Sequence, residues 1–183
     1  RLSMLRIEPD DIESQMDTLR HFKMTQQMRI AAADITEHLA VNKVSDKLTI
    51  LAEVLLSFTV EIAWKILTKK HGMPNISSDM NKNFAIVAYG KMGGYEMGYG
   101  SDIDMVCLHD AELNGSTDHQ FEDVKIISNN EFYVKLVQKI SHICTANTYL
   151  GQLFEIDLRL RPSGNSGLLI SHIDTFEDYQ LNQ

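Results

Sequence analysis

The sequence of 183 residues lacks the features that mark several specialised classes of protein. No apolar stretch reaches the ~18 residues that span a bilayer, and no segment has the pattern of a signal peptide. There is no internal repeat and no low-complexity segment. The remaining composition, 44% hydrophobic and 23% charged residues, is typical of a soluble globular protein. We therefore expect no membrane partner and a cytoplasmic location, in one or two domains with a proper hydrophobic core.

Basic residues and cysteines are both scarce. Only 17 Lys and Arg face 25 Asp and Glu, which gives a formal net charge of −8. Proteins that bind nucleic acid gather basic side chains on one face, so we expect no nucleic-acid partner. The two cysteines, Cys107 and Cys144, suggest neither a disulfide framework nor a metal knuckle. Both are expected to be reduced core residues in a reducing compartment.

The first part of the chain is helical in pattern. Residues from about 10 to 38 contain no Gly or Pro and consist mostly of good helix formers. A second helix is predicted after Ser45 and Asp46, which resemble an N-cap and a first-turn acid, and it stops at Gly72 and Pro74. Its apolar stripe is predicted at Leu48, Leu51, Leu55, Phe58, Ile62 and Ile66.

From Phe84 onward the pattern changes to strands mixed with helices. FAIVAY is predicted as a buried strand, GKMGG as a glycine-rich turn, SDIDMVCLH as a second strand, residues 129–145 as a helix and LFEIDLRL as a third strand. A last helix is predicted from Ser171, its cap. The chain begins at Arg1 and stops in this helix at Gln183, so we expect it to be a piece of a longer protein. The order predicts an α+β fold, a mixed sheet with flanking helices in residues 81–183, preceded by a helical region in residues 1–80.

Two aspartates, Asp102 and Asp104, head the apolar run of the second strand. Isolated buried carboxylates are costly, so something must lie opposite them. Side chains alternate along a strand, which puts Asp102, Asp104 and Val106 on one face and Ile103, Met105 and Cys107 on the other. The same alternation in the third strand puts Glu155, Asp157, Arg159 and Arg161 on one face, opposite Phe154, Ile156, Leu158 and Leu160.

If these two strands are neighbours, Asp102, Asp104 and Asp157 converge on one patch. Three carboxylates at close range repel one another unless a cation neutralises them. Oxygen ligands without His or Cys suit Mg²⁺ or Mn²⁺, and Mg²⁺ commonly bridges carboxylates to substrate phosphates. The pattern therefore favours a divalent metal site and, through it, a nucleoside triphosphate.

The glycine-rich turn fits a phosphate ligand. Gly90, Gly93 and Gly94 allow a close backbone bend whose amides could cradle phosphate oxygens, and Lys91 adds a positive charge. The turn is neither a Walker loop nor a dinucleotide-binding fingerprint, since GxxxxGK[ST] and GxGxxG are both absent. Further cations for a triphosphate would come from Arg159 and Arg161.

Each motif also has a purely structural interpretation. A single D-x-D fits a solvated strand end, ExDxRxR fits an exposed strand face with cross-strand ion pairs, and GKMGG fits a tight turn. The functional interpretation depends on their ordered combination: a glycine turn, a D-x-D strand and a later acidic strand.

That combination resembles a known family. FAIVAYGKMGGYEMGYGSDIDMVCLHD followed by FEIDLRLRPSGNSGLL is similar to the glutamine synthetase adenylyltransferase family, within the nucleotidyltransferase superfamily that includes DNA polymerase beta. The resemblance extends from about Leu19 to the FEDYQ tail, and YGSDIDMVCLHD looks more like the adenylylating, C-terminal half than the AMP-removing half. In that family the domain continues with further helices, so residues 81–183 would be a core truncated at its C-terminal end.

The resemblance implies a mechanism. Asp102 and Asp104 would hold two Mg²⁺ or Mn²⁺ ions, one of them shared with Asp157, and AMP would pass from ATP to a tyrosine of glutamine synthetase with release of pyrophosphate. Ser101, Lys91 and the turn amides would bind the β- and γ-phosphates. The signal protein PII would act through other parts of the full-length protein.

Three further expectations follow. Mutual repulsion would raise the pKa of at least one of the three aspartates when no metal is bound.

One alternative function is the phosphorolytic removal of AMP by the same enzyme. The other is a non-catalytic module that senses nucleotide or binds a partner, which would have no need of a third carboxylate.

Overall fold

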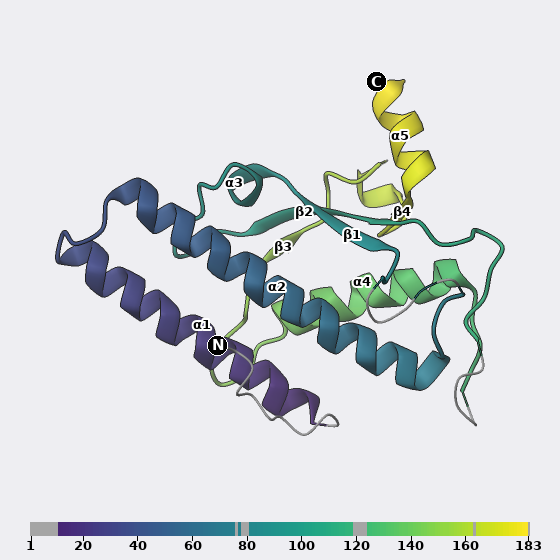
Figure 1. The fold of residues 1–183 in the computed structure, drawn as a ribbon, viewed down its shortest axis with the longest axis horizontal. Coiled ribbons are helices and arrows are strands. Elements are labelled where there is room, and N and C mark those ends of the chain that lie inside the picture. Colours follow the sequence, from purple (N-terminus) through teal and green to yellow (C-terminus); the bar gives the residue numbers. More distant parts are fainter. Residues whose placement is uncertain (1–10, 76, 78–80, 119–123, 163, 183) are drawn as a thin grey trace.

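The structure is a computed structural model, and it describes residues 11–75, 77, 81–118, 124–162 and 164–182. Its elements are, in order, α1 (Ile12–Ile35), α2 (Val41–His71), β1 (Phe84–Ala88), α3 (Gly90–Gly93), β2 (Ile103–His109), α4 (Asn129–Thr145), β3 (Ile156–Asp157), a 3-10 turn (Gly164–Ser166), β4 (Ser171–His172) and α5 (Ile173–Leu181). Helices α1 and α2 lie side by side, α2 also packs on α4, and α5 projects from the body (Figure 1). The predicted α+β fold is confirmed.

The first helix matches its predicted range closely, while the second begins earlier than predicted. The first predicted residue, Asp10, lies outside the described residues. Helix α2 starts at Val41 after Ala40, which makes no side-chain cap, so the N-cap predicted at Ser45 is wrong. Backbone bonds from Lys43 and Val44 to the Ala40 carbonyl close the first turn instead.

The buried stripe of α2 follows the prediction only in its first half. Leu48, Leu51 and Leu55 are buried, but Phe58 is 36% exposed. The C-terminal half instead buries Thr59, Ala63, Trp64 and Leu67. The stripe shifts because the helix has a different neighbour there: the Trp64 ring packs edge-on against Phe132 of α4, with centroids 5.3 Å apart.

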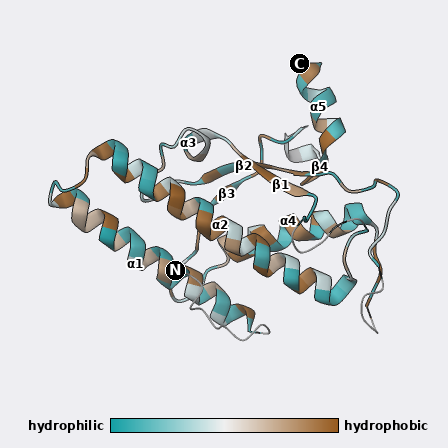
Figure 2. Ribbon diagram, viewed as in Figure 1, coloured by the Kyte–Doolittle hydropathy of each residue, from teal (hydrophilic) through white to brown (hydrophobic). Residues whose placement is uncertain are grey.

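The sheet is mixed, with β2 at its centre. Strand β1 runs antiparallel to β2, from Phe84 opposite His109 to Ala88 opposite Met105. The short strands β3 and β4 both run parallel to β2, β3 beside its start and β4 beside its end. Strand β2 is the most buried of these strands, which agrees with its long apolar run (Figure 2).

The third strand is much shorter than predicted. Only Ile156 and Asp157 form β3, and the chain turns at Arg159 and Leu160. The turn forms because the Asp157 carboxylate accepts a hydrogen bond from the Arg159 backbone amide (2.8 Å), a local bond that competes with strand pairing. The two-face pattern predicted beyond Asp157 is therefore wrong, and Leu160 is 51% exposed.

Helix α4 has the predicted bounds, whereas the cap of α5 differs. The Ser128 side chain caps α4 by accepting from the Glu131 amide. Ser171 was predicted to cap the last helix, but it pairs with Leu108 in the sheet. The cap of α5 is His172, whose side chain accepts from the Asp174 amide.

One hydrophobic cluster joins the helices to the sheet. It includes residues of both parts of the chain, and the division into residues 1–80 and 81–183 stays a prediction. Cys107 and Cys144 lie in this core as free thiols, and burial raises the pKa of each to about 12. Both therefore have the core positions predicted for them. Among the described helices, none combines the length and apolar character needed to cross a membrane.

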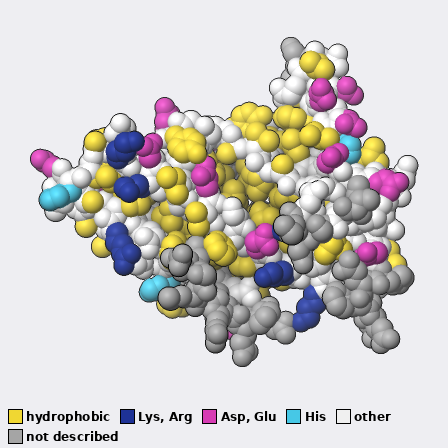
Figure 3. Space-filling view, in the orientation of Figure 1, with side chains coloured by type: hydrophobic (Ala, Val, Ile, Leu, Met, Phe, Trp, Pro, Cys, Tyr) yellow, Lys and Arg dark blue, Asp and Glu magenta, His cyan; other side chains and the backbone are white. Residues whose placement is uncertain are grey.

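Hydrophobic side chains also gather on one face of the molecule, over α2 and β1 (Figure 3). A groove of about 380 Å³ lies there, with Leu56 and Val60 on one wall and Phe84 and Ile86 on the other. Strand β1 pairs only with β2 among the described strands. The groove therefore lies at an outer strand.

Candidate active site

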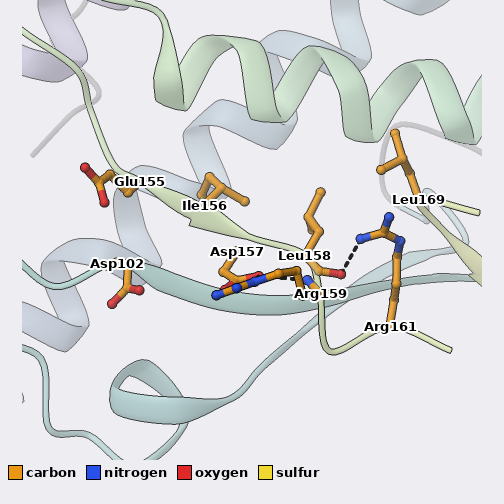
Figure 4. Close-up of a pocket in the computed structure, with 8 residues that line it drawn as sticks. All are labelled: Asp102, Glu155, Ile156, Asp157, Leu158, Arg159, Arg161 and Leu169. Carbon is orange, nitrogen blue, oxygen red and sulfur yellow. Dashed lines mark hydrogen bonds and ion pairs between the residues drawn. The ribbon is translucent and has the colours of Figure 1, made fainter. Parts of the chain in front are cut away.

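Pairing of β2 with β3 brings two of the predicted aspartates together. Asp104 and Asp157 are direct partners in the parallel register, as are Ile103 and Ile156 before them. Asp102 stands two residues before Asp104, so alternation puts it on the same face. The neighbouring strands on which the predicted convergence depended are thus present, and Figure 4 shows Asp102 and Asp157 on facing segments.

The opposite face of β2 is in the core. Ile103 and Met105 are fully buried and Cys107 is 1% exposed, as the alternation predicted. Asp104 is only partly buried, but Val106, on the same face, is fully buried. The carboxylate face is therefore open only at the head of the strand.

The glycine turn lies directly against Asp104. Gly90 has a φ of +54°, and a Cβ built on it would lie 2.2 Å from Asp104 Oδ2. The Tyr89 amide donates to the Asp104 carbonyl at 2.8 Å, which joins the end of β1 to β2. Only glycine permits both this backbone conformation and this approach.

The turn is one turn of helix rather than an open loop. The amides of Gly93 and Gly94 donate to the carbonyls of Tyr89 and Gly90, both at 3.0 Å. The expectation that these two amides would be exposed for phosphate is therefore wrong. A Cβ on Gly93 would also lie 2.5 Å from the Ala88 carbonyl oxygen, so this glycine serves close packing.

Two cations pair with the aspartates. Lys91 Nζ lies 4.0 Å from Asp102 Oδ1, with 59% of the lysine side chain exposed. Arg159 grips Asp157 more closely: its Nε lies 3.0 Å from Oδ1 and 2.8 Å from Oδ2, and its Nη2 lies 2.5 Å from Oδ2. Both cations come from exposed positions next to the carboxylate face.

These pairs set the electrostatics of the site. Hydrogen bonds from Arg159 hold the pKa of Asp157 below its usual range, so Asp157 does not show the rise predicted for at least one of the three aspartates. Burial acts in the opposite direction and is outweighed, because an opposite charge lies at hydrogen-bond distance. The pKa of Arg159 is raised, first by its hydrogen bonds to Asp157 and further by the charges of Asp104 and Asp102. All three carboxylates therefore raise the pKa of Arg159.

Two further predicted phosphate ligands make local contacts in the structure. Ser101 Oγ accepts from the Gly98 amide at 2.9 Å and closes the turn before β2. Arg161 is 8% exposed, and its guanidinium donates to the carbonyls of Leu158 (2.6 Å) and Gly167 (3.5 Å). Arg161 thus holds its own loop, at the far end of the pocket from Asp102 (Figure 4).

A cleft of about 460 Å³ opens at this face, a size typical of small-ligand sites. It is lined by Asp102, Glu155, Ile156, Asp157, Leu158, Arg159, Arg161 and Leu169. Sequence reasoning did not assign Glu155, although it put that residue on the acidic face. It missed Leu169 altogether, because no local pattern shows that the segment after the 3-10 turn returns to β3.

The donor set fits a hard divalent cation. Asp102, Asp104 and Asp157 offer only carboxylate oxygens, which suit Mg²⁺ or Mn²⁺. Within the part of the chain that the structure describes, no three acidic, His or Cys side chains lie together in a metal-binding arrangement. The strand register sets Asp104 beside Asp157, and the Asp157 oxygens are engaged by Arg159. Ligation by Asp157 would require this ion pair to open.

This combination of an α+β fold, a D-x-D strand and a third aspartate on the adjacent parallel strand is that of a nucleotidyltransferase-like domain. The chain belongs to the glutamate-ammonia ligase adenylyltransferase family, whose family model matches residues 2–183. The resemblance seen in the sequence is therefore confirmed.

Curated relatives match over nearly the whole chain, and each is named bifunctional glutamine synthetase adenylyltransferase/adenylyl-removing enzyme. The protein of Alteromonas mediterranea is 54% identical over 183 residues, which are 100% of this chain and 18% of the relative. That of Shewanella frigidimarina is 48% identical over 179 residues, 98% of this chain and 18% of the relative. That of Psychromonas ingrahamii is 46% identical over 183 residues, 100% of this chain and 19% of the relative. The chain thus spans slightly under a fifth of the length of these relatives.

Proposed function

We propose that this region transfers AMP from ATP to a tyrosine of glutamine synthetase, releases pyrophosphate, and forms part of the adenylylating half of a bifunctional enzyme. The observation that carries the proposal is the register of β2 with β3, which sets Asp157 beside Asp104 with Asp102 on the same face. A divalent-metal nucleotidyltransferase requires carboxylates gathered in this way. The names of the relatives supply the acceptor and the reaction.

The aspartates would hold Mg²⁺ or Mn²⁺, which when bound neutralises the triphosphate and lowers the pKa of the acceptor hydroxyl. Asp157 would accept the tyrosyl proton after its ion pair with Arg159 has opened. The tyrosyl oxygen then forms a bond to the α-phosphorus of ATP as the bond from that phosphorus to pyrophosphate breaks. This assignment gives each aspartate a role, whereas a solvated strand end would need none of the three carboxylates.

The remaining site residues would bind the phosphates. Lys91 and Arg159 lie at exposed positions beside the carboxylates and would neutralise the departing pyrophosphate. The amides of Gly90 and Lys91, in the glycine turn beside Asp104, would contribute to this subsite. Ser101 would complete this subsite, while Arg161 would support it from the loop that it holds.

The same proposal includes partners and location. Glutamine synthetase would be the protein substrate, and PII would act through other parts of the full-length protein. We propose no nucleic-acid or membrane partner, and a cytoplasmic location, where ATP is available and thiols such as Cys107 stay reduced.

A second candidate is removal of AMP by phosphorolysis, because the names of the relatives join both activities. It would use phosphate and release ADP from modified glutamine synthetase. A binding-only nucleotide sensor is the third candidate, and the retained third carboxylate speaks against it.

The test is transfer of label from α-labelled ATP to glutamine synthetase by the full-length protein with Mg²⁺. Asp104→Asn should abolish the label with little loss of thermal stability. Asp110→Asn is the matched control, since Asp110 is exposed just beyond the other end of β2, and it should label normally. Full labelling by Asp104→Asn would refute the proposal. Loss of phosphate-dependent ADP release instead of labelling would assign the region to AMP removal.

A further inference from the structure

Helix α1 contacts both chain segments that lead to the aspartates. Near its middle, Arg20 and Lys23 bind backbone carbonyls of the segment before β3. Farther along, Gln27 and Asp34 bind Tyr99, in the segment before β2. These four positions are separated by three, four and seven residues, so they share one face of the helix.

Arg20 is the buried anchor of this face, with only 1% of its surface exposed. Its Nε donates to the Gly151 carbonyl at 2.7 Å, and its Nη2 donates to the carbonyls of Ile143 (3.1 Å) and Ala146 (2.5 Å). The last turn of a helix leaves carbonyls without intrahelical donors. Arg20 therefore ties the end of α4 and the loop after it to α1.

Lys23 holds the next stretch of chain. Its Nζ donates to the Leu153 carbonyl and lies 4.2 Å from the centre of the Phe154 ring. Leu153 is fully buried and Phe154 is 6% exposed, so this stretch has little freedom to move. Asp157 follows only three residues after Phe154.

Tyr99, in the segment that leads to Asp102 and Asp104, is also bound by α1. Its hydroxyl donates to Asp34 Oδ2 at 3.1 Å, and its carbonyl accepts from Gln27 Nε2 at 3.1 Å. Asp102 follows three residues later. The same helix thus fixes the chain immediately before Asp102 and shortly before Asp157.

The sheet alone gives weak control over the separation of these aspartates. The β2–β3 ladder pairs only Ile103 with Ile156 and Asp104 with Asp157. A parallel ladder this short supplies few hydrogen bonds to hold β3 at a set position along β2. The contacts from α1 supply the missing restraint.

We propose that α1 positions the metal-binding aspartates, with Lys23 setting the start of β3 and the Asp34–Tyr99 bond setting the start of β2. Lys23 and Tyr99 are positioning residues, because they act through the backbone of segments that precede the aspartates. The inference rests on the proposed function, since it takes Asp102, Asp104 and Asp157 to bind a divalent ion. It adds that the N-terminal helix supports the metal site from outside by holding the segments that lead to it.

The experiment measures Mn²⁺ binding to the full-length protein by electron paramagnetic resonance, with a non-hydrolysable ATP analogue present. The signal of this site is the component that Asp104→Asn removes. The test variants are Lys23→Met, Lys23→Arg and Tyr99→Phe. Arg29→Met is the matched control, because it deletes a charge from an exposed position of the same helix. Thermal unfolding of every variant is recorded, and Tyr99→Phe guards against misfolding because Tyr99 is 41% exposed.

Loss of one such hydrogen bond should weaken Mn²⁺ binding about fivefold in Lys23→Met and in Tyr99→Phe. Lys23→Arg should restore binding, and Arg29→Met should match the wild type. Unchanged Mn²⁺ affinity in Lys23→Met and in Tyr99→Phe, with or without a fall in melting temperature, would overturn the inference and leave the proposed function standing. If Lys23→Met weakens Mn²⁺ binding but the wild-type protein transfers no label, the proposed AMP transfer alone would be overturned. Wild-type protein without an Asp104-dependent Mn²⁺ signal would overturn both.

Discussion

Gly90 and Asp104 approach each other so closely that a Cβ on the glycine would lie 2.2 Å from the aspartate Oδ2. The glycine belongs to the turn after β1 and the aspartate to β2, so this contact fixes the turn to the carboxylate face. The contact shows that a glycine is needed at position 90 because a side chain has no room there, whereas the sequence suggested a glycine for phosphate binding. It also leads to the first prediction.

Gly90→Ala should damage both stability and activity. Left-handed backbone at a residue with a Cβ costs ~1–2 kcal/mol, and relief of the clash must move Asp104. A displacement near 1 Å at a reacting centre lowers rates by about 100-fold, so AMP transfer should fall by about that factor. Gly100→Ala is the control, because nothing lies within 4 Å of its added Cβ. Equal activities of the two variants would contradict this account.

Arg159→Gln should separate metal binding from transfer. The guanidinium of Arg159 occupies the Asp157 oxygens, so its loss should tighten Mn²⁺ binding in the absence of nucleotide while slowing AMP transfer. Stability should change little, since the arginine of the pair is exposed to solvent. Mn²⁺ titration and labelling of glutamine synthetase measure the two effects. Weaker Mn²⁺ binding in the variant would show that Arg159 does not compete with the metal.

Arg161→Gln should behave differently although it lies only two residues away. Its side chain is buried and its guanidinium donates to the part-buried carbonyls of Leu158 and Gly167, so removal deletes two hydrogen bonds that hold this loop. We expect a loss of about 1–3 kcal/mol in the free energy of unfolding. Denaturant unfolding, followed by fluorescence of Trp64, the single tryptophan, measures it. A stability equal to that of Arg159→Gln would be the contrary result.

His109 should make the stability depend on pH. Its side chain is 3% exposed and stacks on Tyr133 with ring centroids 4.9 Å apart. Burial, aided by His172, lowers the pKa of His109 from 6.5 to about 4, while Asp110 opposes the shift. The folded state therefore stays unprotonated where the unfolded chain takes up a proton.

The free energy of unfolding should accordingly fall as the pH decreases from about 6.5 to about 4, by no more than ~1.4 kcal/mol per pH unit. Below that range this contribution should stay constant. His109→Gln should flatten the curve in this window, whereas His21→Gln, at an exposed position, should not. Urea unfolding at several pH values tests this. Identical slopes for wild type and His109→Gln would exclude His109 as the cause.

Cys107 and Cys144 should resist alkylation in the folded protein. The pKa of each is raised to about 12 by burial, and the thiolate is the reactive form. Iodoacetamide at pH 8 should therefore modify neither thiol until urea unfolds the chain, with mass spectrometry as the readout. Rapid native modification of either one would show that its part of the core opens easily.

Local patterns in the sequence were sufficient for much of the architecture. The residues of α4 follow from apolar periodicity, and alternation along β2 puts Asp102 and Asp104 opposite the buried Ile103 and Met105. The short apolar run placed β1, but its prediction as a buried strand is wrong, because β1 is an outer strand whose residues are partly buried or exposed. These features depend on neighbours a few residues apart, where helical and strand geometry dictate which side chains share a face. The convergence of the aspartates was predictable only on the condition that β2 and β3 pair.

The tertiary structure decided what depends on distant partners. Ser171 pairs with Leu108 instead of capping α5, and Arg161 turns inward to its own loop instead of toward a ligand. Arg20 binds the carbonyl of Gly151, 131 residues away in the chain. No local pattern encodes such contacts, because a polar group will satisfy its hydrogen bonds with whichever partner the folded chain brings near. The sequence alone determined which residues can perform the chemistry, and only the fold decided which of them meet.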